Sequence, residues 1–273
     1  MSLRNQNQLD QEVAHQQQYF RPSCLPALNL RFNFEFFDQF GENYYNQIQL
    51  PAELTKTPED TVVNYFSILR EAENLYVRSC GSVGNAKTPY PIAYNLFSNA
   101  LRDKVHYEDF INSFAGIGHI SLIKLCRLPG EIELRFFYEL ETIHGFKETA
   151  AEFFGYSYGF MELSFEGNGY RINDIQQFSE DFLCAPYHLW QHNAESVVDV
   201  KYGDWCKLIK KRYPTVKQGY VKNIYVLGTD GAYYCFLFFT LTNGTDVEIA
   251  QFRKMNDGKW KLLKMNPDEC IAE

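Results

Sequence analysis

The first regular pattern in the chain is an alternation of apolar and polar side chains over residues 28–37, LNLRFNFEFF. A period of two places successive side chains on opposite faces of a β-strand. We therefore predict a half-buried strand over 28–37, within an N-terminal extension that spans residues 1–52. Its buried face is predicted to carry the apolar set Leu28, Leu30, Phe32, Phe34 and Phe36.

The pattern changes to helical spacing after residue 56. Thr57 can cap a helix, and Pro58 fits the first helical position. Glu59 and Asp60 complement the positive N-terminal end of the helix dipole. Apolar side chains then recur at helical spacing up to residue 76. We predict this helix and two more, over 91–103 and 107–114.

Strand patterns follow the helices. Residues 119–128 are apolar on both faces, which is typical of a central strand. Residues 131–143 alternate, so Glu139 and Glu141 are expected to face solvent. Two further strands, 153–165 and 170–175, are joined by an Asn-Gly turn. Three helices followed by a four-strand antiparallel meander predict an α+β fold with helices on one side of a sheet.

The last third of the chain repeats this order in a shorter form. A helix is predicted over 204–212, followed by strands over 220–227, 232–241, 246–255 and 259–265. The hairpin NGYRIN at 168–173 has a counterpart in DGKWKLLK at 257–264, where a glycine turn again precedes aromatic, basic and aliphatic residues. We therefore predict two α+β domains in tandem, one over 53–182 and a smaller one over 183–273.

Three stretches resemble the nuclear transport factor 2-like superfamily, which has a cystatin-like cone fold. They are the helix TPEDTVVNYFSILRE, the segment YEDFINSFAGIGHI and the hairpin FEGNGYRINDIQ. The order of elements extends the resemblance over 53–181, with 194–266 as a reduced copy. The resemblance implies strongly curved antiparallel sheets around helices, in two cone-like domains. The superfamily contains isomerases, dehydratases and epoxide hydrolases, and also transport and assembly domains, so the fold does not give the function.

The charge of the chain bears on the class of partner. A formal net charge of -8 argues against a general nucleic-acid binder, which needs a basic surface. The basic group Lys207, Lys210, Lys211 and Arg212 is interpreted as a solvated helix face. No run approaches the roughly 18 apolar residues that suggest a membrane-spanning helix, so we predict neither a nucleic-acid partner nor a membrane span.

The cysteine and histidine patterns give no sign of a metal site. The seven cysteines are scattered without a CxxC pair, which indicates neither a zinc site nor a disulfide framework. His188 and His192 lie four residues apart but lack a third ligand, so we predict no metal and no cofactor.

The N-terminus has no signal-peptide pattern, and we expect a cytoplasmic protein. The alternative is the extracytoplasmic domain of an envelope-anchored protein whose leader has been removed.

The candidates for a pocket come from the predicted meander. Tyr156 and Tyr158 share a strand face with Phe160, opposite a face of small residues, which fits an aromatic pocket wall or core packing. His119 follows two glycines where a cone opens, and a general base there needs a carboxylate or hydroxyl partner. The candidate ligand-binding residues are His119, Tyr138, Tyr156, Tyr158 and Asp174.

These patterns contain no recognisable catalytic constellation. We therefore expect a non-enzymatic binding or assembly protein that presents an aromatic-lined cavity or sheet surface. Its expected partners are a small apolar ligand and a second copy of the chain, bound through a sheet face to form a homo-oligomer. The alternative is an isomerase or dehydratase that transfers protons in the cone pocket through His119, Tyr138 or Asp174.

Overall fold

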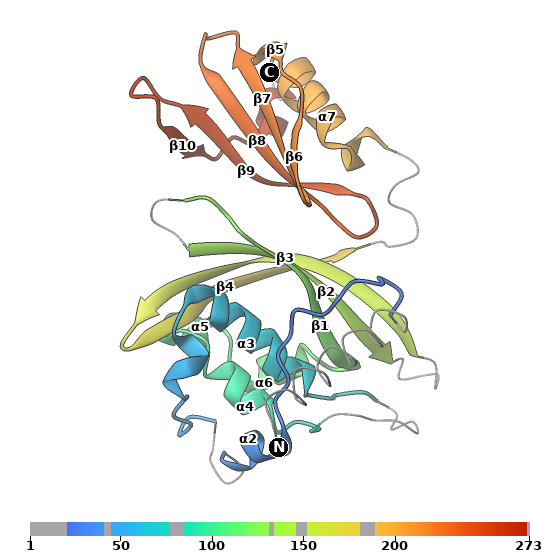
Figure 1. The fold of residues 1–273 in the computed structure, drawn as a ribbon, viewed down its shortest axis with the longest axis vertical. Coiled ribbons are helices and arrows are strands. Elements are labelled where there is room, and N and C mark those ends of the chain that lie inside the picture. Colours follow the sequence, from blue (N-terminus) through green and yellow to red (C-terminus); the bar gives the residue numbers. More distant parts are fainter. Residues whose placement is uncertain are drawn as a thin grey trace, which may run out of the picture. The chain divides into compact units, whose positions relative to one another are not determined.

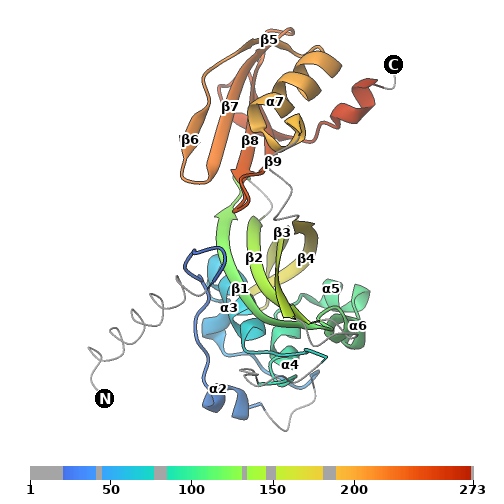
Figure 2. The same ribbon diagram turned by 90° about the vertical axis from the view of Figure 1, so that its right-hand side faces the viewer.

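The computed structural model describes residues 21–40, 45–76, 85–130, 134–145, 152–180 and 189–271 (Figures 1 and 2). The chain divides into two compact units, Met1–Glu180 and Asp181–Glu273. Each unit packs helices against an antiparallel sheet, so the predicted α+β class is confirmed. None of the helices in these ranges is both long and apolar enough to cross a membrane.

The sheet of the N-terminal unit is the predicted meander. Its strands are β1 (Ile117–Arg127), β2 (Leu134–Gly145), β3 (Glu152–Glu166) and β4 (Gly169–Glu180), paired antiparallel in the order β1-β2-β3-β4. Register shifts interrupt the pairing twice in β1 and once between β3 and β4. Such irregularities increase local twist and bend, and the sheet curves over the helices of this unit (Figure 1).

The helix predicted after residue 56 begins as its sequence predicts and ends at residue 70, earlier than the predicted 76. Helix α3 (Pro58–Arg70) starts where the Thr57 hydroxyl accepts from the Asp60 amide at 3.0 Å, and it packs its apolar face on β1. The helix predicted over 91–103 is two helices, α4 (Tyr90–Tyr94) and α5 (Asn99–Lys104), because the backbone between them bonds to β4. Phe97 forms a parallel bridge with Ile172 there. Two further elements complete the layer, η1 (Ala52–Thr55) and α6 (Tyr107–Asn112).

The strand predicted over residues 28–37 is wrong. Residues 34–38 form the helix α2 (Phe34–Asp38), which begins where the Asn33 side chain accepts from the Phe36 amide. The residues before it are extended but belong to none of the strands in the described ranges. Their alternation is real, yet Asn29 points inward while Leu28 and Leu30 are 41% and 54% exposed. Backbone groups of the core need a polar partner here, and Asn29 supplies it.

The C-terminal unit packs a helical segment against one sheet. The helix α7 (Ala194–Val197) continues as the π-helical segment η4 (Val198–Trp205). The sheet has the order β10-β9-β8-β7-β5, and β6 also pairs with β7. Its strands are β5 (Ile209–Arg212), β6 (Val216–Gln218), β7 (Val221–Gly228), β8 (Tyr233–Thr240), β9 (Asp246–Lys254) and β10 (Trp260–Leu263). The four strands predicted for this part correspond to β7–β10 and are confirmed.

The helix predicted over 204–212 is wrong, because residues 209–212 form β5. The true helical segment lies earlier, where Asn193 caps the first turn by accepting from the Ser196 amide at 2.9 Å. Its buried side chains are Ala194, Val197, Val198 and Tyr202, at the spacing of one helix face. Lys210, Lys211 and Arg212 therefore belong to a short strand and not to a solvated helix face.

A disulfide joins Cys206, which follows η4, to Cys270 in η5 (Pro267–Ile271). The absence of a pattern in the cysteine spacing gave no sign of it. The two residues are 64 positions apart, so only the fold brings them together. Three other cysteines of the described part, Cys24, Cys126 and Cys235, are free thiols.

We predict that replacing both disulfide cysteines, Cys206→Ser with Cys270→Ser, lowers the unfolding free energy of the C-terminal unit by about 4 kcal/mol. The reason is that the bond closes a loop of more than sixty residues in the unfolded chain. Urea unfolding followed by tryptophan fluorescence measures the change, because all three tryptophans (Trp190, Trp205 and Trp260) lie in this unit. A reductant should destabilise the wild type and leave the double variant unchanged; equal sensitivity of both would contradict the prediction.

Candidate functional site

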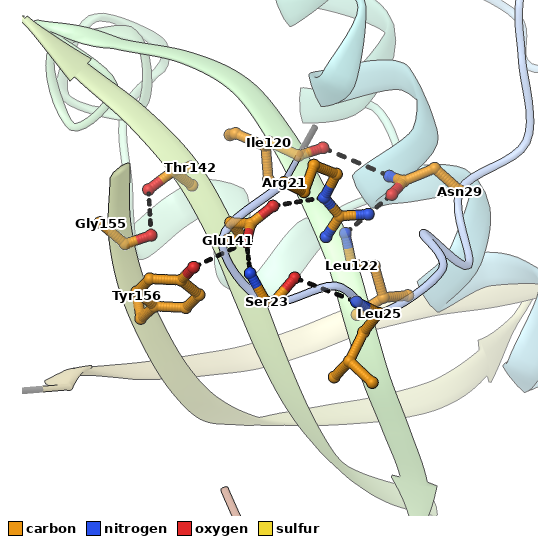
Figure 3. A network of polar contacts seen from close by, with 10 residues as sticks. All are labelled: Arg21, Ser23, Leu25, Asn29, Ile120, Leu122, Glu141, Thr142, Gly155 and Tyr156. Carbon is orange, nitrogen blue, oxygen red and sulfur yellow. Dashed lines mark hydrogen bonds and ion pairs between the residues drawn. The ribbon is translucent and has the colours of Figure 1, made fainter. Parts of the chain in front are cut away.

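The candidate site is built around Glu141 of β2, whose side chain is buried despite its charge. The strand register places it between Ser121 of β1 and Tyr156 of β3. The carboxylate accepts from the Arg21 Nε, from the Ser23 amide at 3.1 Å and from the Tyr156 hydroxyl at 2.7 Å (Figure 3). The prediction that Glu141 faces solvent is therefore wrong.

The hydrogen bonds from these three donors keep Glu141 ionised. Burial by itself raises the pKa of a carboxyl group, because it removes water from the charged form. The hydrogen bonds from Arg21, Tyr156 and Ser23 outweigh that effect, and the pKa of Glu141 lies below its ordinary value. Glu141 is thus a carboxylate at neutral pH, and its oxygens are occupied by bonds that position the N-terminal segment.

Glu139, the other glutamate predicted to face solvent, is also buried. Its carboxylate pairs with the Lys124 ammonium of β1 at 2.9 Å, and the two side chains are 0% and 3% exposed. The alternation along β2 is correct, but both faces of this strand are covered. The prediction of a strand with one solvated face is therefore wrong for residues 134–143, and residues 131–133 lie outside the described part of the chain.

The segment from Arg21 to Arg31 joins β1 to the helix layer. Asn29 is its central contact: its Oδ1 accepts from the Leu122 amide at 2.7 Å, and its Nδ2 donates to the Phe66 carbonyl at 2.9 Å. The Leu30 amide donates to the Ser67 hydroxyl of α3 at 2.8 Å. We call residues 21–31 the N-terminal strap; it places one arginine beside Glu141 and another, Arg31, beside the end of α3.

The C-terminal end of α3 contributes Arg70 and the residue after it, Glu71. Both are buried, at 3% and 7% exposure, and the Arg31 Nε lies 3.2 Å from the Glu71 carboxylate. Burial, and after it the charge of Arg31, lower the pKa of Arg70 to about 10, with Glu71 opposing and Arg21 adding to the effect. Burial raises the pKa of Glu71, against the influence of Arg31 and Arg70.

Several buried polar atoms have no hydrogen-bond partner in the described part of the chain. At the end of α3 they are the Nε and Nη2 of Arg70 and the Oε1 of Glu71, and beside Glu141 they are the Nη1 and Nη2 of Arg21 and the hydroxyl of Ser121. Buried polar groups in proteins nearly always have partners, so each exception asks for an explanation. We call Arg21, Arg31 and Arg70, with Glu71, His119 and Glu141, the arginine cluster.

His119 lies on β1 next to this cluster. It follows Gly118 at a register shift and adopts a left-handed backbone with φ 51°, a conformation uncommon outside glycine. Burial, then Arg70, Arg21 and Arg31, lower its pKa to about 4, while Glu141 opposes them. His119 is therefore neutral at physiological pH and adds no positive charge to the cluster.

Of the residues predicted to form a pocket, Tyr156 donates to Glu141, and His119 lies near enough to Glu141 and the three arginines for their charges to change its pKa. Tyr138 lies in the hydrophobic core, where its ring packs on Phe66 and its hydroxyl donates to a backbone carbonyl of β4. Asp174 pairs in register with Glu162, on the sheet face opposite to Tyr138. Tyr138 and Asp174 therefore cannot share a proton at one site.

Tyr158 belongs to an aromatic group on the sheet face that also carries Tyr156. Its ring stacks on Phe178 at 5.4 Å and lies 5.8 Å from Phe137, whose ring is 5.3 Å from Phe160. On the opposite face of β3, a side chain at Gly159 would collide with the Tyr138 hydroxyl. Gly159 and Gly155 thus make room for the β2 side chains Tyr138 and His144.

Sequence reasoning missed most of the arginine cluster. One signal was available for Arg70, which lies four residues after Phe66 and eight after Val62 and so falls on the buried face of its helix. Arg21 and Arg31 carried no such signal, because the partners that bury or pair them are distant in sequence.

The acidic and histidine side chains of the arginine cluster do not form a metal site. Across the described ranges, no group of three or more His, Cys, Asp or Glu residues is arranged to hold a metal ion. Of the two histidines considered as ligands, His188 lies outside the described residues, and the His192 Nδ1 is 3.4 Å from the Thr245 hydroxyl. No protein-family model, curated protein or solved structure matches the chain.

We predict that Glu141→Gln lowers the unfolding free energy of the N-terminal unit by about 3 kcal/mol, because it leaves the Arg21 charge buried without its counterion. Near-UV circular dichroism of tyrosine during urea unfolding measures it. The control is Glu162→Gln, which removes a partly exposed pair with Arg135 at 3.6 Å and should cost less than about 1 kcal/mol. Equal losses in the two variants would refute a structural role for the buried pair.

We also predict that the stability of the N-terminal unit falls as pH drops from about 6.5 towards about 4. The folded pKa of His119 lies below its unfolded value, so in this window the unfolded state binds the extra proton and protonation favours unfolding. His119→Gln should remove this part of the pH slope, whereas His106→Gln, at an exposed position, should keep it. Histidine resonances in NMR titrations give the midpoint directly, and a His119 midpoint near 6.5 would contradict the assignment.

Proposed function

We propose that the chain is a non-enzymatic binding protein whose ligand site is the arginine cluster of its N-terminal unit. The observation that carries this proposal is Arg70, which is 3% exposed and has two N–H donors without an acceptor among the described residues. A buried guanidinium without acceptors costs several kcal/mol. A ligand that supplies those acceptors recovers this free energy on binding.

The pKa values of Glu141 and His119 favour ligand binding over proton transfer. A general acid or base works best with a pKa near the working pH. Glu141 has its pKa lowered and is fully engaged by donors, and the pKa of His119 is about 4. Neither group is suited to exchange protons near neutral pH, so the cluster is better suited to hold a charged ligand than to perform acid–base chemistry.

We include membership of the nuclear transport factor 2-like superfamily in this proposal. The support is the order of elements: helices α3–α6 precede a four-strand antiparallel meander that bends over them (Figure 1). The same order occurs in other α+β proteins, and for that reason the binding function is argued from the cluster and not from the fold.

The aromatic group on the sheet adds a second part to the proposal. Phe137, Tyr158, Phe160 and Phe178 form a continuous set of ring contacts on one face of the sheet. Phe137 is fully buried and Phe178 is 45% exposed, so an apolar ligand or the same face of a second copy would meet the outer rings of this set. We propose that the apolar ligand and the second copy of the chain, both expected from the sequence, bind at this aromatic face.

The disulfide between Cys206 and Cys270 favours the extracytoplasmic alternative, because structural disulfides persist in oxidising compartments and are rare in reducing ones. We therefore propose that the chain works outside the cytoplasm. Alkylation of free thiols in protein isolated from its native cells, before and after reduction, distinguishes the two compartments.

We predict that a small-molecule screen by differential scanning calorimetry finds compounds that raise the unfolding temperature saturably, because a ligand that binds only the folded state stabilises it. The panel should contain anionic, cationic and neutral apolar compounds, at matched ionic strength. Sedimentation velocity on the same samples tests self-association. If no compound of any class stabilises the protein, the proposed binding function is wrong.

A further inference from the structure

We propose that the C-terminal unit binds single-stranded nucleic acid on the face of its sheet opposite to the helical segment. This inference goes beyond the binding function proposed above, because the arginine cluster belongs to the other unit. It rests on a row of side chains that crosses the sheet and combines ammonium groups with aromatic rings. We call it the cross-strand row, and its members are Lys211, Leu227, Tyr233, Lys254 and Trp260.

The strand register places the row on the outer face of the sheet. Val226 of β7 and Tyr234 of β8 pack in the core with the helical segment. Successive side chains of a strand point to opposite faces, so their neighbours Leu227 and Tyr233 lie on the outer face. Lys211 of β5 pairs in register with Leu227, and Leu227 pairs with Tyr233. The first three members of the row therefore share the outer face.

Lys254 and Trp260 continue the row to the edge strand β10. The Lys254 Nζ lies 6.0 Å from the centre of the Tyr233 ring, and Lys254 pairs in register with Trp260. The Trp260 ring lies 5.8 Å from that of Tyr225, which is also on the outer face. Tyr233 and Trp260 are 44% and 38% exposed, and both lysines of the row are exposed. Two rings and two ammonium groups are thus open to a ligand.

The acidic side chains of this unit lie away from the outer face. Within strands β5–β10 the acidic residues are Asp246 and Glu248, and both accept hydrogen bonds from the helical segment on the other face. Asp230, in the turn before β8, pairs with Arg253 at 2.9 Å, and Asp257 lies in the turn between β9 and β10. The charge that these strands present on the outer face is therefore positive.

The sequence of the unit agrees with this charge. Residues 205–229 contain six lysine or arginine residues and no aspartate or glutamate. Residues 1–180 contain 23 acidic and 14 basic residues, whereas residues 181–273 contain 11 and 12. The negative charge of the chain thus comes from the N-terminal unit. It is no argument against a nucleic-acid partner of the C-terminal unit.

Rings and ammonium groups together select the kind of polyanion. Unpaired bases stack on aromatic side chains whatever their sequence, and lysines neutralise the phosphates between them. An acidic peptide or polysaccharide supplies charge without flat aromatic rings to stack on Trp260 and Tyr233, and the bases of a duplex are already stacked on each other. Neighbouring strands lie about 4.8 Å apart, so the five strands of the row extend over about 19 Å, room for about four nucleotides.

The test is fluorescence anisotropy of the full chain with a labelled oligothymidylate of about twenty nucleotides at low salt. The logarithm of the association constant should fall with the logarithm of salt concentration with a slope of about -1.4, as expected for two neutralised phosphates. Trp260→Ala should weaken binding at least about fivefold, and Trp260→Phe should keep most of the affinity because it keeps a ring. Lys254→Met should reduce the slope by about 0.7.

The matched control for the lysine is Lys217→Met. Lys217 is exposed and pairs in register with Lys222, whose Nζ bonds to Asp246 on the helical face. This variant should leave the salt slope unchanged. Arg70→Met, in the arginine cluster, should also leave oligonucleotide binding unchanged, so the inference and the proposed function can fail separately. Circular dichroism of each variant checks that the exposed substitutions leave the fold intact.

Four outcomes overturn the inference. The first is no binding of the oligonucleotide at low salt, and the second is equal affinity of the wild type, Trp260→Ala and Lys254→Met. The third is a duplex of the same sequence length bound as tightly as the single strand. The fourth is heparin or polyglutamate of matched charge bound as tightly as the oligonucleotide, because that result shows a site for polyanions in general.

Discussion

The buried pair of Arg21 and Glu141 is the interaction on which the N-terminal unit most depends. A charge of either sign is expensive to bury alone, and a pair is tolerated only when further hydrogen bonds complete it. Tyr156 and the Ser23 amide complete the Glu141 side. The pair thereby fixes the start of the N-terminal strap against the middle strands of the sheet, and Asn29 fixes the rest of the strap between β1 and α3. Without this anchoring, the arginines of the strap would have no defined place beside α3.

The parts of the fold that could be predicted from sequence are those with local signals. Helix α3 has its cap, its proline and its acidic first turn within four residues, and β2 to β4 have alternation and an Asn-Gly turn. The failures have equally specific causes. Residues 28–37 alternate, but a half-buried Asn29 faces inward in place of Leu28 and Leu30, because its amide group bonds to backbone groups that only the folded unit brings near. Residues 204–212 have helical spacing, yet β5 forms because β7 offers it a hydrogen-bonding edge.

The candidate site was predictable only in part, for a similar reason. His119 and Tyr156 stand out in the sequence because of their glycine-rich and aromatic surroundings. Their actual partners, Arg21, Arg70 and Glu141, look like ordinary charged residues of a surface. A sequence pattern can show that a residue is unusual among its neighbours, but it cannot show that two charges 120 residues apart are buried together. The same limit applies to Cys206 and Cys270.

The long separation between the strap and its anchors has a consequence for how the unit folds. The meander needs only contacts between neighbouring strands, which form early because short loops cost little entropy to close. Of these residues the strap is made first, its partner Glu141 is made much later, and Tyr156, which bonds to Glu141, is made last. Docking of Arg21 must therefore wait until β2 has been synthesised, and its site is complete only when β3 has paired with β2. Until then its arginines stay hydrated, and their desolvation becomes one of the final steps in completing the unit.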